Sequence, residues 1–286
     1  MRSIILGAPA KINLSLDIIG TLPDGFHEVE MIMQSVSLMD VIKLTRIPEG
    51  IRLHTSCDKI PAGEENLAWK AASFFIEELG IKDGVEIYID KQIPVAAGLA
   101  GGSTDAAAVL RGMNYISGAT MSENHIYKLA AELGSDVPFC LKGGTALARG
   151  RGEKVTFLPD ISRQNIVLVV PPVEVSTAEI YDKYDQIQPD IFISTEKMVK
   201  AIQEGKSISW SEGWRNVLEE VTGRLVEDIA RIKDKLSYFE PVFSMMSGSG
   251  PAVFSVVNSC EKAEYIQKKW PYAKDRVFVT SFKGRY

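Results

Sequence analysis

The stretch that decides the fold is residues 91–113, KQIPVAAGLAGGSTDAAAVLRGM. It places Gly98, Gly101 and Gly102 within five positions, directly before a dense run of alanine, valine and leucine. Glycine lets a backbone curl and approach a ligand closely. The first amide groups of a helix lack hydrogen-bond partners and carry a partial positive charge. We therefore predict an anion-binding loop over residues 97–104 that leads into a helix.

Two familiar phosphate-binding loops do not fit this stretch. A P-loop ends in G-K-[ST] and a dinucleotide-binding loop reads G-x-G-x-x-G, and neither pattern is present here. The alternative that the spacing leaves open is a flexible connection whose small residues allow close packing. The following helix, expected from about Thr104, is apolar almost all round, which predicts that it is buried.

The bulk composition excludes several classes of protein. A length of 286 residues suits one large domain or two modest ones. The net charge of −5 argues against nucleic-acid binding, which needs clustered cations. Scattered cysteines and histidines disfavour disulfides and a zinc site. The N-terminal apolar run is broken at Pro9, and no stretch is long enough to span a membrane, so we expect a cytoplasmic protein without a membrane partner.

Strands and helices are predicted to alternate along the whole chain. Residues 10–19 alternate apolar and polar side chains, which is typical of a half-buried strand. Further strands are expected within 29–47, 84–93, 143–158, 165–172, 251–257 and 275–282. Helices are expected over 65–80, 122–134 with Ser122 as its cap, 177–185, 194–203, 218–234 and 260–270. This mixture predicts two α+β lobes, which we divide into residues 1–158 and 159–286.

Four stretches resemble one family of enzymes. Residues 94–107, PVAAGLAGGSTDAA, resemble the phosphate-binding motif of the GHMP kinase superfamily. Residues 8–40, residues 133–153 and MMSGSGPAVF at 245–254 resemble further segments of one branch of that superfamily. The resemblance implies a two-lobed GHMP kinase fold, with an N-terminal lobe like ribosomal protein S5 domain 2 and a C-terminal ferredoxin-like lobe.

The resemblance also implies an activity. In this branch ATP is the phosphoryl donor, Mg²⁺ assists, and the acceptor is the 2-hydroxyl of a small molecule, a cytidine diphosphate-linked methylerythritol of non-mevalonate isoprenoid biosynthesis. Another GHMP kinase, such as a homoserine kinase, and a non-catalytic nucleotide-binding module are the alternatives. We expect a monomer or a weak homodimer.

Two residues are candidates for catalysis. Lys11 lies on the polar side of the first strand, where a solvated lysine is the ordinary reading. Asp136 lies in GSDVPF, between a helix-ending glycine and a proline that favours a first helical turn, so a helix cap is equally compatible with its position. The resemblance makes Lys11 and Asp136 the catalytic pair and gives Asn13 a role in holding the acceptor.

The resemblance assigns a larger set of residues to ATP. Ser103 is the hydroxyl expected nearest Mg²⁺. Alanine replaces a common glycine at position 100, so we expect the αR or β conformation there. A surface lysine and a helix-cap asparagine are the ordinary readings of two members, Lys91 and Asn66. The full set is Asn66, Lys91, Pro94, Ala97, Gly98, Leu99, Ala100, Gly101, Gly102, Ser103 and Thr104.

A third set is assigned to the acceptor. Phe26 and His27 follow a tight turn, and a ring beside polar groups suits a nucleobase. A core aromatic beside a surface imidazole is the alternative. The resemblance places Tyr181 on the cytosine as a second ring. Thr177 lies beside it, and Gly248 and Ser249 lie in a glycine-rich turn that is otherwise read as a hairpin turn.

Overall fold

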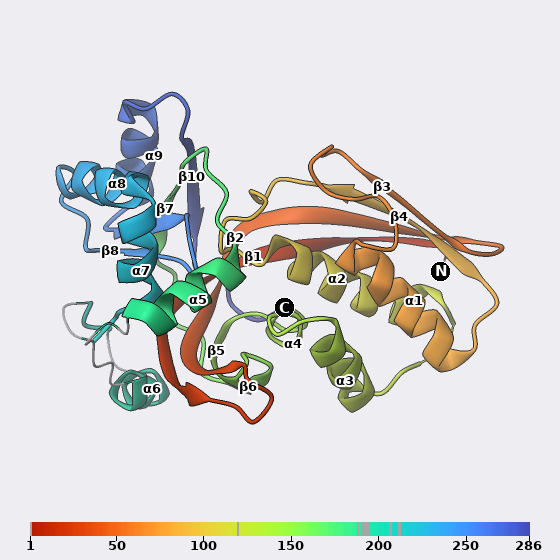
Figure 1. Cartoon of the computed structure of the whole chain (residues 1–286). Coiled ribbons are helices and arrows are strands. Elements are labelled where there is room, and N and C mark those ends of the chain that lie inside the picture. Colours follow the sequence, from red (N-terminus) through yellow and green to blue (C-terminus); the bar gives the residue numbers. More distant parts are fainter. Residues whose placement is uncertain (1, 119, 188, 190–194, 206–207, 211–212) are drawn as a thin grey trace. The chain divides into compact units, whose positions relative to one another are not determined.

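The structure is a computed structural model that describes residues 2–118, 120–187, 189, 195–205, 208–210 and 213–286. The chain forms two compact units (Figure 1). The first unit consists of the residues up to Ala10, Leu38–Val95 and Ala100–Lys142, and the second consists of Lys11–Ser37, Ala96–Leu99 and Gly143–Tyr286. Each unit therefore contains segments that are distant in the sequence. The division at residues 158 and 159 stays a prediction.

The first unit combines a sheet with four helices. Its strands are β3 (Ile51–Thr55) and β4 (Gly84–Asp90), together with parts of β1 (Ser3–Thr21) and β2 (His27–Ile47), which continue into the second unit. Its helices are α1 (Leu67–Leu79), α2 (Gly101–Ile116), α3 (Glu123–Leu133) and α4 (Val137–Cys140). Strand β4 pairs parallel with β3 and antiparallel with Val41–Ile47 of β2. Helices α1 and α2 pack against each other (Figure 1).

Helices α1 and α3 of the first unit begin at the capping residues that the sequence predicts. The Asn66 side chain accepts a hydrogen bond from Ala68 N at the start of α1, and Gly80 ends that helix in the left-handed conformation. Ser122 caps α3 in the same way. Helix α2 is buried on nearly every face, as predicted, but it starts three residues before Thr104, at Gly101.

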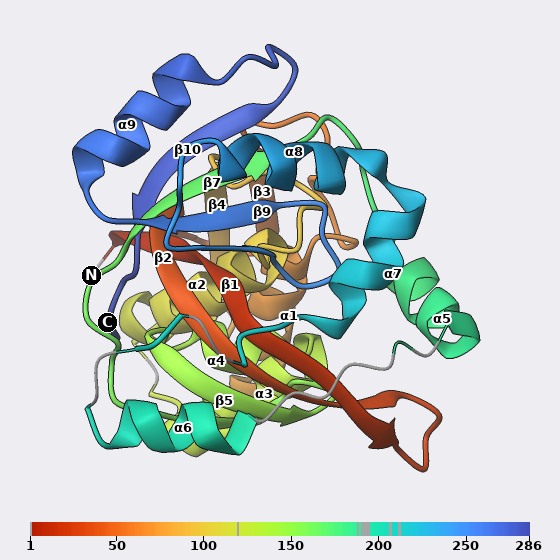
Figure 2. The ribbon, with the colours of Figure 1, turned by 90° about the vertical axis from the view of Figure 1, so that its left-hand side faces the viewer.

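The second unit contains a sheet of its own. Strands β10 (Arg276–Ser281), β7 (Asn165–Val170), β9 (Val253–Val257) and β8 (Phe243–Met246) follow one another in that order, all antiparallel. Helices α8 (Glu227–Ser237) and α9 (Cys260–Lys269) pack on this sheet (Figure 2). The remaining elements are β5 (Thr145–Gly150), β6 (Lys154–Phe157), α5 (Thr177–Ile187), α6 (Thr195–Gln203) and α7 (Val217–Leu225). Strand β5 pairs with Val29–Gln34 of β2 and with β6.

Several sequence predictions are wrong in detail. The helix expected over 218–234 is two helices, because Val226 between them has an extended backbone. Strands β3 and β8 were not among the predicted strands. The predicted start of a helix at residue 194 lies outside the described residues.

Among the described residues, no helix has both the length and the apolar character needed to cross a bilayer.

The expectation that the first strand is half-buried is also wrong. The apolar side chains of Ile12, Leu14 and Leu16 in the middle of β1 are buried, and so are the alternate polar ones, Lys11, Asn13 and Ser15. The Ser15 hydroxyl accepts a hydrogen bond from Ile32 N at 3.2 Å. A polar group tolerates burial when it is hydrogen-bonded, so this face of β1 is a buried polar row and not a solvated one.

Candidate active site

Lys11 and Asn13 form the centre of the polar row on β1. The Lys11 side chain donates from Nζ to Asn13 Oδ1 at 2.7 Å, and Lys11 is only 5% exposed. Asn13 is fully buried and its amide nitrogen contacts Met31 Sδ at 3.0 Å. An ammonium group is costly to bury, so the reading of Lys11 as a solvated strand lysine is wrong.

Two segments meet beside Asn13. They are Gly98 of the glycine loop, residues 97–104, and the start of the Gly-Ser-Gly turn, residues 248–250. Ser247 Oγ accepts a hydrogen bond from Asn13 N at 3.3 Å and donates to Gly98 O at 3.0 Å. Gly98 has φ +74°, and a Cβ built on it would lie 2.2 Å from Ser247 O. Only glycine meets both conditions. The Lys11 backbone N–H also donates to Leu99 O at 3.2 Å, so the loop is bound to β1 as well.

Asn216 anchors the Gly-Ser-Gly turn from the start of α7. Its amide nitrogen donates to Met246 O at 3.0 Å and to Gly248 O at 2.7 Å, while its Oδ1 caps α7 by accepting from Leu218 N. The side chain is buried, so each of these bonds replaces one that water would make. Sequence reasoning missed Asn216, although an asparagine directly before a helical pattern is a recognisable cap signal.

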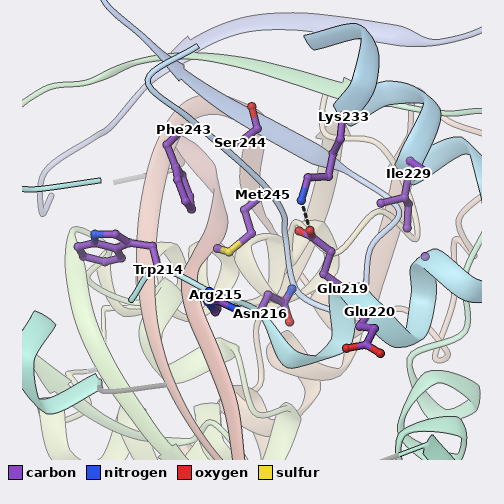
Figure 3. Close-up of a pocket in the computed structure, with 12 residues that line it drawn as sticks. Trp214, Arg215, Asn216, Glu219, Glu220, Ile229, Lys233, Phe243, Ser244 and Met245 are labelled. Carbon is purple, nitrogen blue, oxygen red and sulfur yellow. Dashed lines mark hydrogen bonds and ion pairs between the residues drawn. The ribbon is translucent and has the colours of Figure 1, made fainter. Parts of the chain in front are cut away.

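A pocket of about 470 Å³ lies beside Asn216 (Figure 3). Glu219 projects into it from α7, pairs with Lys233 of α8 and accepts a hydrogen bond from Met246 N at 2.6 Å. The strand that leads into the Gly-Ser-Gly turn is therefore held by two side chains, the amide of Asn216 at the N-cap of α7 and the carboxylate of Glu219 within that helix.

Exchanging Asn216 for aspartate is expected to destabilise the protein. In Asn216→Asp the cap oxygen is kept, but a carboxylate oxygen replaces the donor that faces two carbonyls. Leaving these buried acceptors unsatisfied is expected to lower the free energy of unfolding by about 3 kcal/mol, measured by urea unfolding. Ser259→Asp, a carboxylate at the N-cap of α9, is the control and should change stability by less than about 0.5 kcal/mol. Equal stability of the two variants would contradict the anchoring role.

The predicted nucleobase residues lie together in the second unit. His27 Nε2 donates a hydrogen bond to Asp185 Oδ1 at 2.7 Å, and the centroid of its ring lies 4.9 Å from that of Tyr181. Tyr184 contacts the same imidazole edge-on at 6.0 Å. Burial, together with the carboxylates of Asp17 and Asp185, raises the pKa of Tyr184, which keeps its hydroxyl protonated. Sequence reasoning missed Tyr184 and Asp185, which follow Tyr181 on α5.

Phe26 offers a free aromatic face beside this cluster. Its residue is 56% exposed, and the Arg151 guanidinium lies 5.1 Å from the ring centroid. The reading of Phe26 as a core aromatic is therefore wrong.

Thr177, at the start of α5, shares a hydrogen bond of 2.9 Å with Ser249 Oγ, so two of the predicted acceptor residues are in contact.

The start of α2 has the geometry of an anion cradle. The hydrogen bond from Thr104 N to Ala100 O is 2.9 Å long, and the amides of Gly101, Gly102 and Ser103 precede it. The Thr104 hydroxyl donates to Pro9 O at 2.8 Å and is buried, whereas Ser103 is half-buried. Of the two hydroxyls, Ser103 is therefore the one available to a ligand.

The expected conformation of Ala100 is wrong. Its φ of 56° and ψ of 33° are left-handed, not αR or β. A left-handed conformation costs a residue with a Cβ about 1–2 kcal/mol. Ala100 is the N-cap of α2, so the packing of that helix fixes its backbone against the local preference of alanine.

Lys91 lies in a buried ion cluster of the first unit. Its ammonium pairs with Asp40 and lies 2.9 Å from Asp105 Oδ2, with the side chain 4% exposed. The reading of Lys91 as a surface lysine is therefore wrong. Burial lowers the pKa of Lys91, but the attraction of Asp105 and Asp40 outweighs it, so the pKa lies above its ordinary value. Burial raises the pKa of Asp105 well above its usual range, against the opposing effect of Lys91.

The remaining predicted residues are placed as follows. Asn66 is the cap of α1, which confirms that reading without testing a role in ATP binding. Asp136 occupies the N-cap position of α4, but its side chain makes no cap hydrogen bond. Pro94, Ala97 and Leu99 are buried, so their side chains support the loop from within.

A magnesium site would need few ligands from the protein. Among the described residues no group of three or more His, Cys, Asp or Glu side chains is arranged to hold a metal ion. Mg²⁺ binds mainly phosphate and water oxygens, with one or two oxygens from the protein. The Ser103 hydroxyl, at the start of α2, fits that requirement.

Comparisons with known proteins identify the family. A sequence model described as GHMP kinases N terminal domain matches residues 66–144, and one described as GHMP kinases C terminal matches residues 198–275. A 4-diphosphocytidyl-2-C-methyl-D-erythritol kinase of Syntrophomonas wolfei is 43% identical over 280 residues, 98% of each chain. The chain belongs to the 4-diphosphocytidyl-2-C-methyl-D-erythritol kinase family of GHMP kinases.

Further relatives of this family agree. The kinase of that name from Acetivibrio thermocellus is 47% identical over 269 residues, which cover 92% of this chain and 93% of the relative. A crystal structure of 4-(cytidine 5'-diphospho)-2C-methyl-D-erythritol kinase matches 98% of this chain and all of its own at a TM-score of 0.84 and 30% identity. A homoserine kinase of Cytophaga hutchinsonii, at 22% identity and a TM-score of 0.76, shares the fold. The predicted GHMP kinase fold is confirmed.

Proposed function

We propose that this chain transfers the terminal phosphoryl group of ATP to the 2-hydroxyl of 4-diphosphocytidyl-2-C-methyl-D-erythritol, a step of non-mevalonate isoprenoid biosynthesis. One observation carries the proposal. A buried lysine, Lys11, contacts Asn13, and Asn13 is hydrogen-bonded through Ser247 to the glycine loop. The names of relatives that match almost the full chain support the choice of acceptor.

The catalytic roles follow from the demands of phosphoryl transfer. The transition state is loose and spreads negative charge over the transferred group, so positioning and charge stabilisation matter more than covalent chemistry. We assign charge stabilisation to Lys11, which Asn13 holds in place. Asp136 orients the acceptor hydroxyl and accepts its proton as the oxygen–phosphorus bond forms.

The donor site is proposed along the glycine loop. The amides of Gly101, Gly102 and Ser103 bind the phosphates of ATP, helped by the positive end of the helix macrodipole. The Ser103 hydroxyl would hold Mg²⁺ together with phosphate oxygens, and the ion would neutralise charge on them.

The acceptor site is proposed around α5 and the start of β2. Phe26 stacks on the cytosine with its free face, and the Arg151 guanidinium on the ring limits its movement. His27, oriented by Asp185, supplies a polar edge for the base, and Tyr181 supplies a second ring. Thr177 and Ser249 are hydrogen-bonded to each other, and we assign both to binding the part of the acceptor beyond the cytosine.

Losing the Phe26 ring is expected to weaken acceptor binding alone. Stacking on an aromatic side chain contributes about 1–3 kcal/mol per base, so Phe26→Ala should raise the KM of the acceptor about tenfold or more. The KM of ATP should stay within a factor of about two, since the ring is not part of the donor site. Phe26→Tyr keeps the ring and is the control. Steady-state kinetics with each substrate varied in turn measure the two KM values. A rise of both KM values together in Phe26→Ala would contradict the assignment.

A coupled assay tests the function directly. Purified protein with ATP and Mg²⁺ should phosphorylate 4-diphosphocytidyl-2-C-methyl-D-erythritol and not homoserine, as followed by ADP release and by ³¹P NMR of the product. Turnover of homoserine alone would favour the homoserine kinase alternative. ATP binding without transfer to either acceptor would favour a non-catalytic nucleotide-binding module.

A further inference from the structure

We propose that Asp40, Lys91 and Asp105 form a positioning cluster that fixes the start of α2, and with it the amide groups that bind ATP. The proposal rests on the proposed function, in which those amides hold the phosphates. In this role Lys91 stabilises the backbone of the glycine loop and does not contact the nucleotide.

The cluster connects three segments of the first unit. Asp40 comes from β2, Lys91 follows β4, and Asp105 belongs to the first turns of α2. Asp40 Oδ2 pairs with the Lys91 ammonium, and Asp40 Oδ1 accepts from the backbone amides of Gln92 at 2.6 Å and Ile93 at 2.8 Å. A single carboxylate therefore holds both the ammonium and the backbone that leads into the glycine loop.

The Lys91 ammonium lies close to the first turn of α2. A Cβ built on Gly101 would come within 2.8 Å of Lys91 Nζ, and Asp105 Oδ2 lies 2.9 Å from the same nitrogen. A cation near the positive end of a helix is unfavourable unless anions compensate it. The two carboxylates supply that compensation. They leave the positive end of α2 directed at the loop, where phosphate would bind.

The burial of Lys91 argues against direct contact with a nucleotide. With its side chain 4% exposed and its ammonium bonded to two carboxylates, little of it can reach a ligand. Asp105 Oδ1 is buried without a hydrogen-bond partner among the described residues. A buried oxygen without a hydrogen bond lowers the stability of the fold. Such a cost is typical of groups that hold a functional site in one geometry.

Asp40→Asn is the sharpest test of the proposal. The asparagine oxygen can still accept from the two backbone amides, while its NH₂ group faces the ammonium in place of a carboxylate. We expect the KM of ATP and the Kd for ATP to rise about tenfold, because small displacements of positioning groups are costly. The KM of the acceptor should not change. Hydrogen exchange of the amides of residues 98–104 should become faster, while that of β7 and β9 stays as in the wild type.

Asp90→Asn provides a matched control. Asp90 ends β4 one residue before Lys91, but its carboxylate bonds the Gln92 side chain and Ser56, outside the cluster. This variant should match the wild type in every measurement. Asp105→Asn serves as a second test if Asp40→Asn does not fold. It keeps an oxygen for Lys91 and should give a smaller rise in the KM of ATP with the same local change in exchange.

Two results would overturn the proposal. One is a folded variant of the cluster with unchanged ATP affinity and unchanged exchange at residues 98–104. The other is exchange that rises uniformly across the first unit, which indicates a merely structural role. Failure of the proposed function looks different, because wild-type protein would then transfer no phosphoryl group, while ATP affinity and hydrogen exchange would still report on the cluster.

Discussion

Asp136→Asn should lower kcat by about a thousandfold while the Kd for ATP stays near that of the wild type. General acid–base groups contribute about 10²–10⁴-fold to a rate, and asparagine keeps the shape of aspartate without its basicity. Because binding of ATP does not need the carboxylate in this assignment, the loss should fall on turnover. Single-turnover kinetics and equilibrium titration with ATP measure the two quantities.

Ser122→Ala separates this expectation from the reading of Asp136 as a helix cap. The Ser122 side chain makes a cap hydrogen bond at the start of α3, in the same unit, whereas Asp136 makes none at α4. Loss of a cap should lower the free energy of unfolding by about 1 kcal/mol and leave kcat unchanged. If Asp136→Asn instead behaves like Ser122→Ala, with reduced stability and normal turnover, Asp136 is a cap and not a catalyst.

Lys11→Met should lower kcat by about 10²–10³-fold, the range found when one group that stabilises transition-state charge is removed. Methionine fills much of the same space, so β1 should keep its place. The variant leaves Asn13 Oδ1 without its partner at 2.7 Å, which should also lower the free energy of unfolding by about 1–3 kcal/mol. Turnover and urea unfolding are therefore measured on the same preparation.

Lys43→Met is the matched control for Lys11→Met. Lys43 is also a strand lysine, on β2, but it is exposed. Its loss should affect neither turnover nor stability by a measurable amount, since exposed charges away from special contacts contribute little. Normal turnover in a folded Lys11→Met variant would remove Lys11 from the mechanism.

Local signals account for the parts of the fold that the sequence predicts well. Helix α1 begins at an asparagine cap and ends at Gly80, and α2 follows glycines with an almost continuous apolar run. Both patterns act through neighbours in the sequence. The glycine loop was found for the same reason, because its spacing and its resemblance to the GHMP motif lie in one short stretch.

Distant partners explain what the sequence does not predict. The polar residues of β1 read as solvated because Ser247, which binds Asn13, lies directly after β8, late in the chain. Asn216 and Asp40 act through backbone groups that no local pattern connects to them. The left-handed backbone of Ala100 goes against the preference of its own side chain, so only the packed helix reveals it.

The interleaved make-up of the two units has a consequence for synthesis of the chain. Residues 11–37 leave the ribosome early, but they belong to the second unit, most of which is encoded after residue 142. The first unit can close while translation continues, whereas the early strands must wait for the C-terminal half. A gene fragment for residues 159–286 would lack those strands and Ala96–Leu99, so we expect it to yield insoluble product unless residues 1–158 are supplied together with it.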